Sequence, residues 1–144
     1  MKIADILHTK GHTVHSVFEW QTVSEVVEHL WSTKTGALLV LDRQQNIRGI
    51  VSERDIVRAL RQHRDGLMPL PVSEIMTRNV RTCASTETVA HAMALMTSGR
   101  HRHLPVVDGT TLVGMVSIGD LVKYRVAEME LETGVLRDAA LGRY

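Results

Sequence analysis

Hydrophobic and polar residues along the chain follow two periods, which predict short strands and amphipathic helices. Apolar residues at positions 23, 26, 27, 30 and 31 have the i, i+3, i+4, i+7, i+8 spacing of one helix face. The Thr22 hydroxyl and Glu25 are placed to form a capping box at the start of this helix. Strand-like runs at 37–42 and 47–52 follow, joined by a polar turn. With a short strand at 14–17 and a helix over 53–63, the order is β-α-β-β-α.

The same pattern occurs a second time. Residues 22–60 align with residues 88–125 when one gap is placed opposite Gln44, and residues 3–7 correspond to residues 72–76. The second copy therefore predicts a strand at 80–83, a helix from Thr88, strands at 103–108 and 112–117, and a helix from 119 to about 130. Its first helix carries the apolar positions Val89, Ala92, Met93 and Met96.

The repeat predicts how the chain is divided. We expect one repeat over residues 1–65, a Gly- and Pro-containing linker over 66–71, a second repeat over 72–130, and a charged tail over 131–144. A unit of about sixty residues is small for a core of its own. The two repeats are therefore expected to pack face to face in a mixed α+β or α/β fold, with related clefts between them.

Composition and charge exclude several classes of protein. Apolar residues make up 44% of the chain, which excludes general disorder. The 17 basic and 16 acidic residues leave a net charge of +1, unlike a general nucleic-acid or membrane binder. The single Cys83 excludes an internal disulfide framework. Asp5 interrupts the start where a leader would be apolar, and the aliphatic runs are too short to span a bilayer. We expect a cytoplasmic protein.

One motif closes the third strand of both repeats. Residues 49–55 and 114–120 each begin with Gly, reach a Ser at the strand end and place an Asp three residues later. This is the spacing of a capping box at a helix start. A carboxylate at a strand's carboxyl end can also accept hydrogen bonds from a ribose diol, and the Ser and free amides can meet phosphate. The Gly would allow close backbone approach. Neither interpretation excludes the other.

Residues 2–127 resemble a tandem pair of cystathionine-β-synthase (CBS) domains, a Bateman module. The resemblance rests on four strings, at residues 49–55, 75–77, 102–108 and 114–120. It implies two β-α-β-β-α repeats packed with pseudo-twofold symmetry, in a stand-alone signal-transduction protein of bacterial type. It also implies clefts for adenosine-containing ligands, with AMP first and ADP, ATP, NAD or S-adenosylmethionine as others.

The resemblance assigns a ligand-binding role to specific positions. Asp55 and Asp120 would hold ribose hydroxyls, assisted by Ser52 and Ser117 at ribose or phosphate. Segments entering the first and second strands of each repeat would border the adenine, mainly through backbone groups: Thr13, Val14, His15, Val80, Arg81, Thr82, Gly36, Ala37, Leu38, Arg102, His103 and Leu104. Phosphates would lie near the cations Lys10, Arg54, Arg58, Arg100 and His101.

The two clefts are expected to be unequal and poor in aromatic rings. Arg54 of the first repeat corresponds to Gly119 of the second, and Ala37 corresponds to His103. Since each charged hydrogen bond to phosphate contributes about 1.5–3 kcal/mol, one arginine could decide occupancy. Aromatic residues form only 3% of the chain, so aliphatic walls and backbone amides are expected to hold the adenine.

Three alternatives compete with this interpretation. His8, His12 and His15, or His101 and His103, could bind a metal, but the predicted helix break at Gly11 separates the first group and no Cys joins them. The run 100–103 could contact nucleic acid, although it lacks interleaved aromatics. Cys83 and His91 could be a nucleophile and base, but no acid orients them. No catalytic constellation emerges, so we expect no enzyme.

The sequence thus predicts a regulatory sensor that binds a nucleotide. A ligand bridging both repeats would favour one arrangement of them, and the last helices would transmit it to a separate downstream protein. The resemblance implies a homodimer shaped as a flat disc. Candidate contacts lie on helix faces, unless these residues are simply core: Ile56, Val57, Leu60, Leu121 and Val122.

Overall fold

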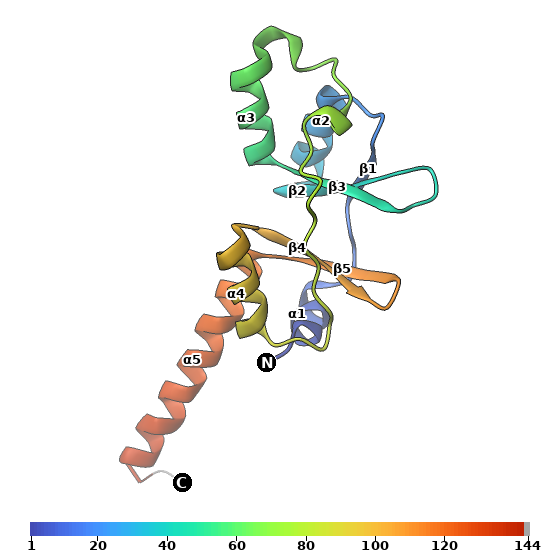
Figure 1. The fold of residues 1–144 in the computed structure, drawn as a ribbon. Helices are drawn as coiled ribbons and strands as arrows, with labels where there is room; N and C mark the ends of the chain where they lie inside the picture. The colour runs from blue at the N-terminus through green and yellow to red at the C-terminus, as the bar shows by residue number, and fades with distance from the viewer. Residues whose placement is uncertain (143–144) are drawn as a thin grey trace. The chain divides into compact units, whose positions relative to one another are not determined.

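The computed structural model describes residues 1–142, and for residues 135–139 it describes the course of the helix alone. The chain forms two compact units of mixed α+β structure (Figure 1). One unit contains residues 14–80. The other combines Met1–Thr13 with the chain from Arg81 onward.

The unit of residues 14–80 is built on a three-stranded sheet. Its strands are β1 (Ser16–Phe18), β2 (Ala37–Leu41) and β3 (Ile47–Ser52). The central strand β2 runs parallel to β1 and antiparallel to β3, and all its residues are buried. Helices α2 (Val23–Thr33) and α3 (Glu53–His63) accompany the sheet, and short 3₁₀ turns follow at Arg64–Gly66 and Val72–Glu74.

Helix α2 forms where its periodicity predicts, with two differences in detail. Val23, Val26 and Leu30 enter the core. Trp31, in the last turn of the helix, is expected on the same face but is 82% exposed. The Thr22 hydroxyl accepts the expected hydrogen bond from the Glu25 amide at 3.2 Å. The Glu25 carboxylate, however, accepts from the side chain of Gln21 at 2.8 Å, so only half of the predicted capping box forms.

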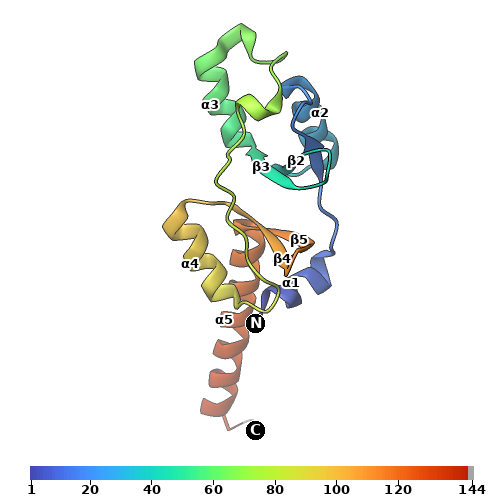
Figure 2. The same cartoon turned by 45° about the vertical axis from the view of Figure 1, so that its right-hand side comes forward.

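The other unit is built on the antiparallel pair β4 (His103–Asp108) and β5 (Thr111–Ser117). Three helices belong to it: α1 (Ile3–Lys10), α4 (Val89–Gly99) and α5 (Ile118–Ala140). Helix α1 packs against β5 and α5, and α4 packs against α5 (Figure 2). Their buried side chains form one core: Ile3, Ile6, Leu7, Cys83, Val89, Ala92, Met96, Leu104, Val106, Val116 and Leu121.

Three predicted elements differ from the structure, and the first of them, the strand expected at 14–17, forms over Ser16–Phe18. Of the strand expected at 80–83, only Cys83 pairs, as an isolated parallel bridge to Val106. The chain passes from one compact unit to the other between Val80 and Arg81, so Val80 does not belong to the unit that contains β4. The last helix, expected to end near residue 130, continues to Ala140. Within residues 1–142, no helix combines the length and apolar character needed to cross a bilayer.

The compact units do not coincide with the sequence repeats, because the leading segments are exchanged. Helix α1 leads the first repeat, yet Ile3, Ile6 and Leu7 are buried in the core that the second repeat supplies. Val72 and Met76 of the second repeat's leading segment are buried with β2 and β3 of the first. Each core is therefore completed by the other repeat.

The segment 66–71, expected to link the repeats, is packed within the unit of residues 14–80. Leu67 is fully buried beside Val23 and Ala59. The Val23 amide donates to the Leu70 carbonyl at 2.9 Å, and the Ser24 amide donates to the Met68 carbonyl at 3.1 Å. These bonds satisfy amides at the start of α2 that have no partner within the helix.

The glycines at 49 and 114 make room for the exchanged segments. Ile50 and Thr77 exchange two backbone hydrogen bonds of 2.9 Å, which brings residues 76–77 onto β3. A Cβ at position 49 would lie 2.6 Å from Met76 Sδ and 2.8 Å from the Thr77 carbonyl oxygen. At position 114 it would lie 2.6 Å from the Leu7 side chain. The sequence predicts that these glycines allow another group to approach the backbone closely. In the structure, that group is the exchanged segment of the same chain.

We predict that Gly49→Ala lowers the free energy of unfolding by about 1–3 kcal/mol, because a backbone carbonyl would have to move. Gly114→Ala should cost less, since the obstructing atoms are the tip of a side chain. Gly66→Ala is the control, because no atom lies within 4 Å of the added methyl group. Urea denaturation of the three variants checks this order, and equal stability of Gly49→Ala and Gly66→Ala would contradict it.

Candidate functional site

The Ser-x-x-Asp motifs form the capping box predicted for them in both units. Ser52 donates its amide to Asp55 Oδ2 at 2.8 Å, and its hydroxyl accepts from the Asp55 amide at 3.3 Å. The corresponding bonds between Ser117 and Asp120 measure 2.9 and 3.1 Å. Each carboxylate is thereby fixed at the first turn of the helix that follows the strand, where it also meets the helix dipole favourably.

Asp55 is enclosed by protein donors. Its Oδ2 also accepts from the Ser52 hydroxyl at 3.1 Å. Its Oδ1 accepts from the Thr77 hydroxyl at 2.9 Å and from the Arg58 guanidinium at 3.2 Å. The side chain is 4% exposed. With about four acceptor positions on a carboxylate, these bonds leave Asp55 little capacity for another donor.

Asp120 has a more open environment and a different partner. Lys10 Nζ donates to Asp120 Oδ2 at 2.6 Å and to the Met115 carbonyl at 2.9 Å. The carboxylate side chain is 26% exposed and that of Lys10 is 38% exposed. Burial acts to raise the pKa of Asp120, but the Lys10 and Ser117 hydrogen bonds and the Lys10 charge outweigh it. The pKa therefore lies below its ordinary value.

In each unit the exchanged leading segment supplies a donor to the motif carboxylate. Thr77 follows the leading segment of the second repeat and reaches Asp55 of the first. Lys10 ends α1 of the first repeat and reaches Asp120 of the second. Sequence reasoning gave no role to Thr77. Its signal was its place in the 75–77 string, but its partner follows only from the packing of that segment on β3.

Several predicted site residues gather at the start of α3. Ala37 lies opposite Ser52 and Leu38 opposite Val51 in the β2–β3 ladder. The Gly36 carbonyl accepts from the Glu53 amide at 3.1 Å, so it is already used in closing the helix start. His15 lies one strand further, where its carbonyl accepts from the Leu39 amide. Arg54 and Arg58 are exposed on the first turns of α3.

A second group gathers at the start of α5. His103 lies opposite Ser117 and Leu104 opposite Val116 in the β4–β5 ladder. The Arg102 carbonyl accepts from the Ile118 amide at 2.8 Å, in the position equivalent to Gly36. Arg100 caps the end of α4 in the left-handed conformation, and the His101 amide donates to the Met96 carbonyl. The β4 entrance therefore places Arg102 and His103 beside the Asp120 motif.

The remaining predicted residues lie where the chain passes between units. Thr13 and Val14 flank one passage, Val80 and Arg81 flank the other, and Thr82 follows directly. Thr13 and Thr82 are exposed, while Val14 and Val80 are half-buried. Their suggested contact with adenine stays a prediction.

The structure gives the surroundings of several histidines and of the cysteine that the alternative interpretations use. His12 Nδ1 lies 2.8 Å from the Val113 carbonyl, and the His15 ring meets His29 edge-on. In the part of the chain that the structure describes, no three His, Cys, Asp or Glu side chains gather in a metal-binding arrangement. Burial, with Glu87 and Asp108 nearby, raises the pKa of the Cys83 thiol to about 12. A thiol with that pKa is a poor nucleophile.

We predict that Lys10→Met raises the pKa of Asp120, measured by ¹³C NMR titration of the side-chain carboxyl. The low pKa means that this carboxylate stabilises the fold at neutral pH, and the contribution is lost as the pH falls through its folded pKa. The stability difference between wild type and Lys10→Met should accordingly be largest at neutral pH and vanish in acid. Lys2→Met, at the other end of α1, is the charge-matched control. An unchanged Asp120 pKa in Lys10→Met would contradict the assignment.

Comparison with known proteins gives consistent results over most of the chain. The model of the CBS domain matches residues 3–62 and 72–127. The mitochondrial CBS domain-containing protein CBSX3 of Arabidopsis thaliana is 35% identical over 150 residues, covering 99% of this chain and 73% of CBSX3.

Solved structures share the fold. The CBS-domain containing protein ATU1752 from Agrobacterium tumefaciens superposes with a TM-score of 0.84 at 37% identity, covering 86% of this chain and 92% of that one. The CBS domain protein PAE2072 from Pyrobaculum aerophilum, solved in complex with AMP, has a TM-score of 0.76 at 31% identity, covering 92% of this chain and 99% of that one. The exchanged segments, the paired Ser-x-x-Asp motifs and these matches agree: the chain belongs to the CBS domain family and carries two CBS domains in tandem.

Proposed function

We propose that the protein is a regulatory sensor of an adenosine nucleotide, with AMP as the leading ligand, and that it acts by binding and not by turnover. The observation that carries the proposal is the partly exposed Asp120 carboxylate, held at a helix start with Lys10 beside it. A carboxylate and a cation side by side suit the ribose and phosphate of one nucleotide. The AMP complex of PAE2072 supports the ligand class.

The two motif carboxylates have different roles in this proposal. Asp120 is 26% exposed and Asp55 is 4% exposed, so a ribose hydroxyl can reach the first far more easily. All four recorded bonds to the Asp55 carboxylate come from Ser52, Arg58 and Thr77. A ligand that displaced the half-buried Ser52 or Thr77 would leave that donor unpaired, at a cost of about 1–3 kcal/mol, whereas the Arg58 side chain is 71% exposed and could turn to water. We therefore assign ribose binding to Asp120 and a structural role to Asp55.

Basic residues near the start of β4 supply the phosphate partners. Lys10 holds its Nζ within hydrogen-bond distance of Asp120. Arg100 and Arg102 have exposed side chains, and His101 is half-buried. The sequence predicts that the two clefts bind a nucleotide unequally. We propose that the site at Asp120 has the higher affinity. Arg54 is exposed on the first turn of α3, next in sequence to the enclosed Asp55.

The Lys10–Asp120 pair offers a way to signal. Lys10 belongs to the first repeat and Asp120 to the second. A ligand whose phosphate takes Lys10 away from Asp120 therefore changes how the end of α1 is held against β5 and the start of α5. Only a ligand with different affinity for the two states can shift their populations. We propose that this change alters the arrangement of the two repeats and is passed to a separate downstream protein.

We further propose that the protein acts as a homodimer through the α3 face. Val57 is 68% exposed and Leu60 is 48% exposed, which leaves apolar surface uncovered on this helix. Ile56 is half-buried against the core of its own unit. Leu121, another candidate contact from the sequence, is fully buried in the core of its own unit and cannot contact a partner, whereas the candidate Val122 is 44% exposed on α5.

Isothermal titration calorimetry with AMP, ADP, ATP, NAD and S-adenosylmethionine tests the proposal. Asp120→Asn should weaken AMP binding about tenfold or more, because it removes a charged acceptor of the ribose hydroxyls. Asp55→Asn should lower the unfolding free energy but leave AMP affinity within about threefold. Asp65→Asn, on an exposed turn, is the matched control.

Two results would overturn the assignment. Absence of binding by every ligand in the panel would remove the nucleotide proposal. Unchanged AMP affinity in Asp120→Asn would remove the ribose role of that carboxylate. Two further experiments test the alternative functions. Metal analysis of the untagged protein tests metal binding, and filter binding with RNA at several salt concentrations tests nucleic-acid binding.

A further inference from the structure

The end of β1 carries an aromatic pair that the proposed function does not use. The rings of Phe18 and Trp20 are stacked, with centroids 4.6 Å apart and an angle of 2° between their planes. Trp20 lies in a tight turn closed by Gln21, whose side-chain oxygen accepts from the Phe18 amide at 2.8 Å and whose amide donates to the Phe18 carbonyl at 3.0 Å. Trp20 is nevertheless 48% exposed. Its indole is therefore held in one orientation while part of it faces solvent.

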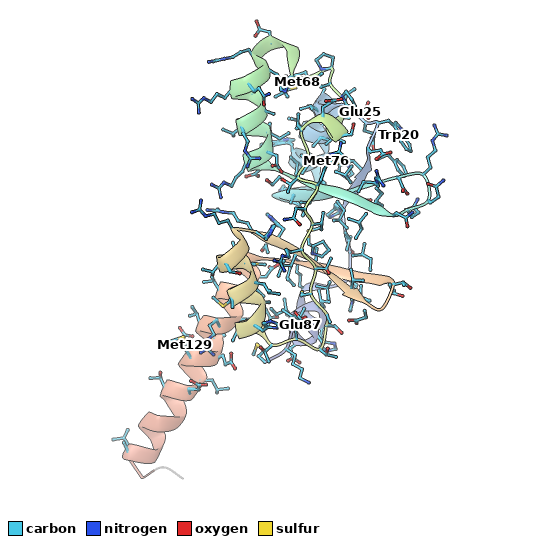
Figure 3. All side chains as sticks on the ribbon, viewed as in Figure 1. Trp20, Glu25, Met68, Met76, Glu87 and Met129 are labelled. Atoms are coloured by element: carbon cyan, nitrogen blue, oxygen red, sulfur yellow. The ribbon has the colours of Figure 1, made fainter. Side chains whose placement is uncertain are left out.

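Two arginines from the β2–β3 hairpin lie beside this pair. The Arg43 guanidinium lies over the Trp20 ring, with its central carbon 5.2 Å from the ring centroid. Arg48 Nε lies 3.5 Å from the Glu19 carboxylate, in the turn that holds Trp20, and the Arg48 side chain is 51% exposed. Figure 3 labels Trp20 on the side of the unit where this hairpin projects. All of these residues belong to the unit of residues 14–80.

The acidic groups of this surface already have partners. Glu19 pairs with Arg48. Asp42 accepts from the Gln44 and Asn46 amides, at 2.9 Å each, and so closes the hairpin turn. Among the residues that the structure describes, no carboxylate is close enough to form an ion pair with Arg43. The cluster therefore presents an aromatic ring and positive charge, and its own acids do not neutralise Arg43.

The second repeat lacks this cluster. The alignment of the repeats places small or uncharged residues at the positions of Phe18, Trp20, Arg43 and Arg48, namely Ala84, Thr86, Gly109 and Val113. The core and the capping box of that repeat form without an aromatic or basic residue at these positions. Neither the fold of a repeat nor its Ser-x-x-Asp motif therefore requires the cluster.

We propose that the first repeat binds single-stranded nucleic acid at this cluster, with one base stacked on Trp20 and the neighbouring phosphates on Arg43 and Arg48. Aromatic rings that stack bases, flanked by cations that follow the backbone, hold single strands with little dependence on sequence. The basic run 100–103 has cations without aromatic residues between them, whereas this cluster has both. A duplex is a poorer ligand, because its bases are already stacked on one another.

The base can reach the indole on the face that Arg43 now covers. Phe18 occupies the opposite face of the ring. An exposed cation–π contact is weaker than the stacking of a base, so the base can replace the guanidinium over the ring. The displaced guanidinium then pairs with a phosphate of the same strand. Arg48 can likewise exchange the partly exposed Glu19 carboxylate for a phosphate.

Fluorescence anisotropy with a labelled oligouridylate of about 12 nucleotides tests the stacking, since single-strand binders cover about 4–16 nucleotides. Trp20→Thr should weaken binding about tenfold or more, because the base loses its stacking partner. Trp31→Thr is the matched control and should bind as the wild type does. Trp31 is 82% exposed, and each variant carries the residue found at the equivalent position of the second repeat, Thr86 or Thr97. In Trp31→Thr the one remaining Trp is Trp20, whose fluorescence the oligonucleotide should quench.

Salt dependence tests the phosphate contacts. Arg43→Gln and Arg48→Gln should each lower the affinity, and each should reduce the slope of log K against log salt by about 0.7. Arg61→Gln, at an exposed arginine of α3, is the control and should leave the slope unchanged. AMP affinity should be the same in all these variants, because Asp120 belongs to the other compact unit. Failure here is therefore distinguishable from failure of the nucleotide proposal.

Four results would overturn the proposal. The first is absence of oligonucleotide binding by the wild type at low salt, and the second is equal affinity of Trp20→Thr and Trp31→Thr. The third is competition by polyglutamate as effective as that by unlabelled oligouridylate, which would indicate an acidic protein segment as the partner. The fourth is binding that Arg100→Gln with Arg102→Gln abolishes but Trp20→Thr retains, which would assign the nucleic acid to the run 100–103.

Discussion

The exchange of leading segments between the repeats is the contact on which the rest of the structure depends. Each repeat is too small for a comfortable core, and each core is completed by side chains from the other repeat: Ile3, Ile6 and Leu7 in one unit, and Val72 and Met76 in the other. Gly49 and Gly114 permit the close packing of these segments on β3 and β5. Each unit is therefore built from residues of both repeats.

The same exchange determines the electrostatics of the motif carboxylates. Asp55 receives Thr77 and Asp120 receives Lys10, each brought by an exchanged segment. A neutral hydroxyl together with Arg58 closes the first carboxylate, whereas a flexible ammonium leaves the second partly exposed. Two motifs with the same local geometry therefore differ in what they can bind. The difference comes from their partners, since the capping boxes are alike.

Predictions that rest on local patterning agree closely with the structure. Helices α2 and α3 begin at the Thr22 and Ser52 caps, and strands β2 to β5 lie within a residue of their expected bounds. Periodicity and capping are local properties, so they can be read from the chain. Departures occur where packing decides. Cys83 pairs with Val106 alone, and no part of the unit covers Trp31 at the end of the buried face of α2.

By itself, the sequence determined the repeat, the CBS resemblance, the element order and the capping role of both Ser-x-x-Asp motifs. The tertiary structure decided which repeat completes which core, and hence that Lys10 meets Asp120 and that Thr77 meets Asp55. The physical reason is that these partners lie on segments whose sequence resembles the opposite repeat's equivalent segment. Only packing against Gly49 or Gly114, together with burial of the apolar side chains, selects the core that each segment joins.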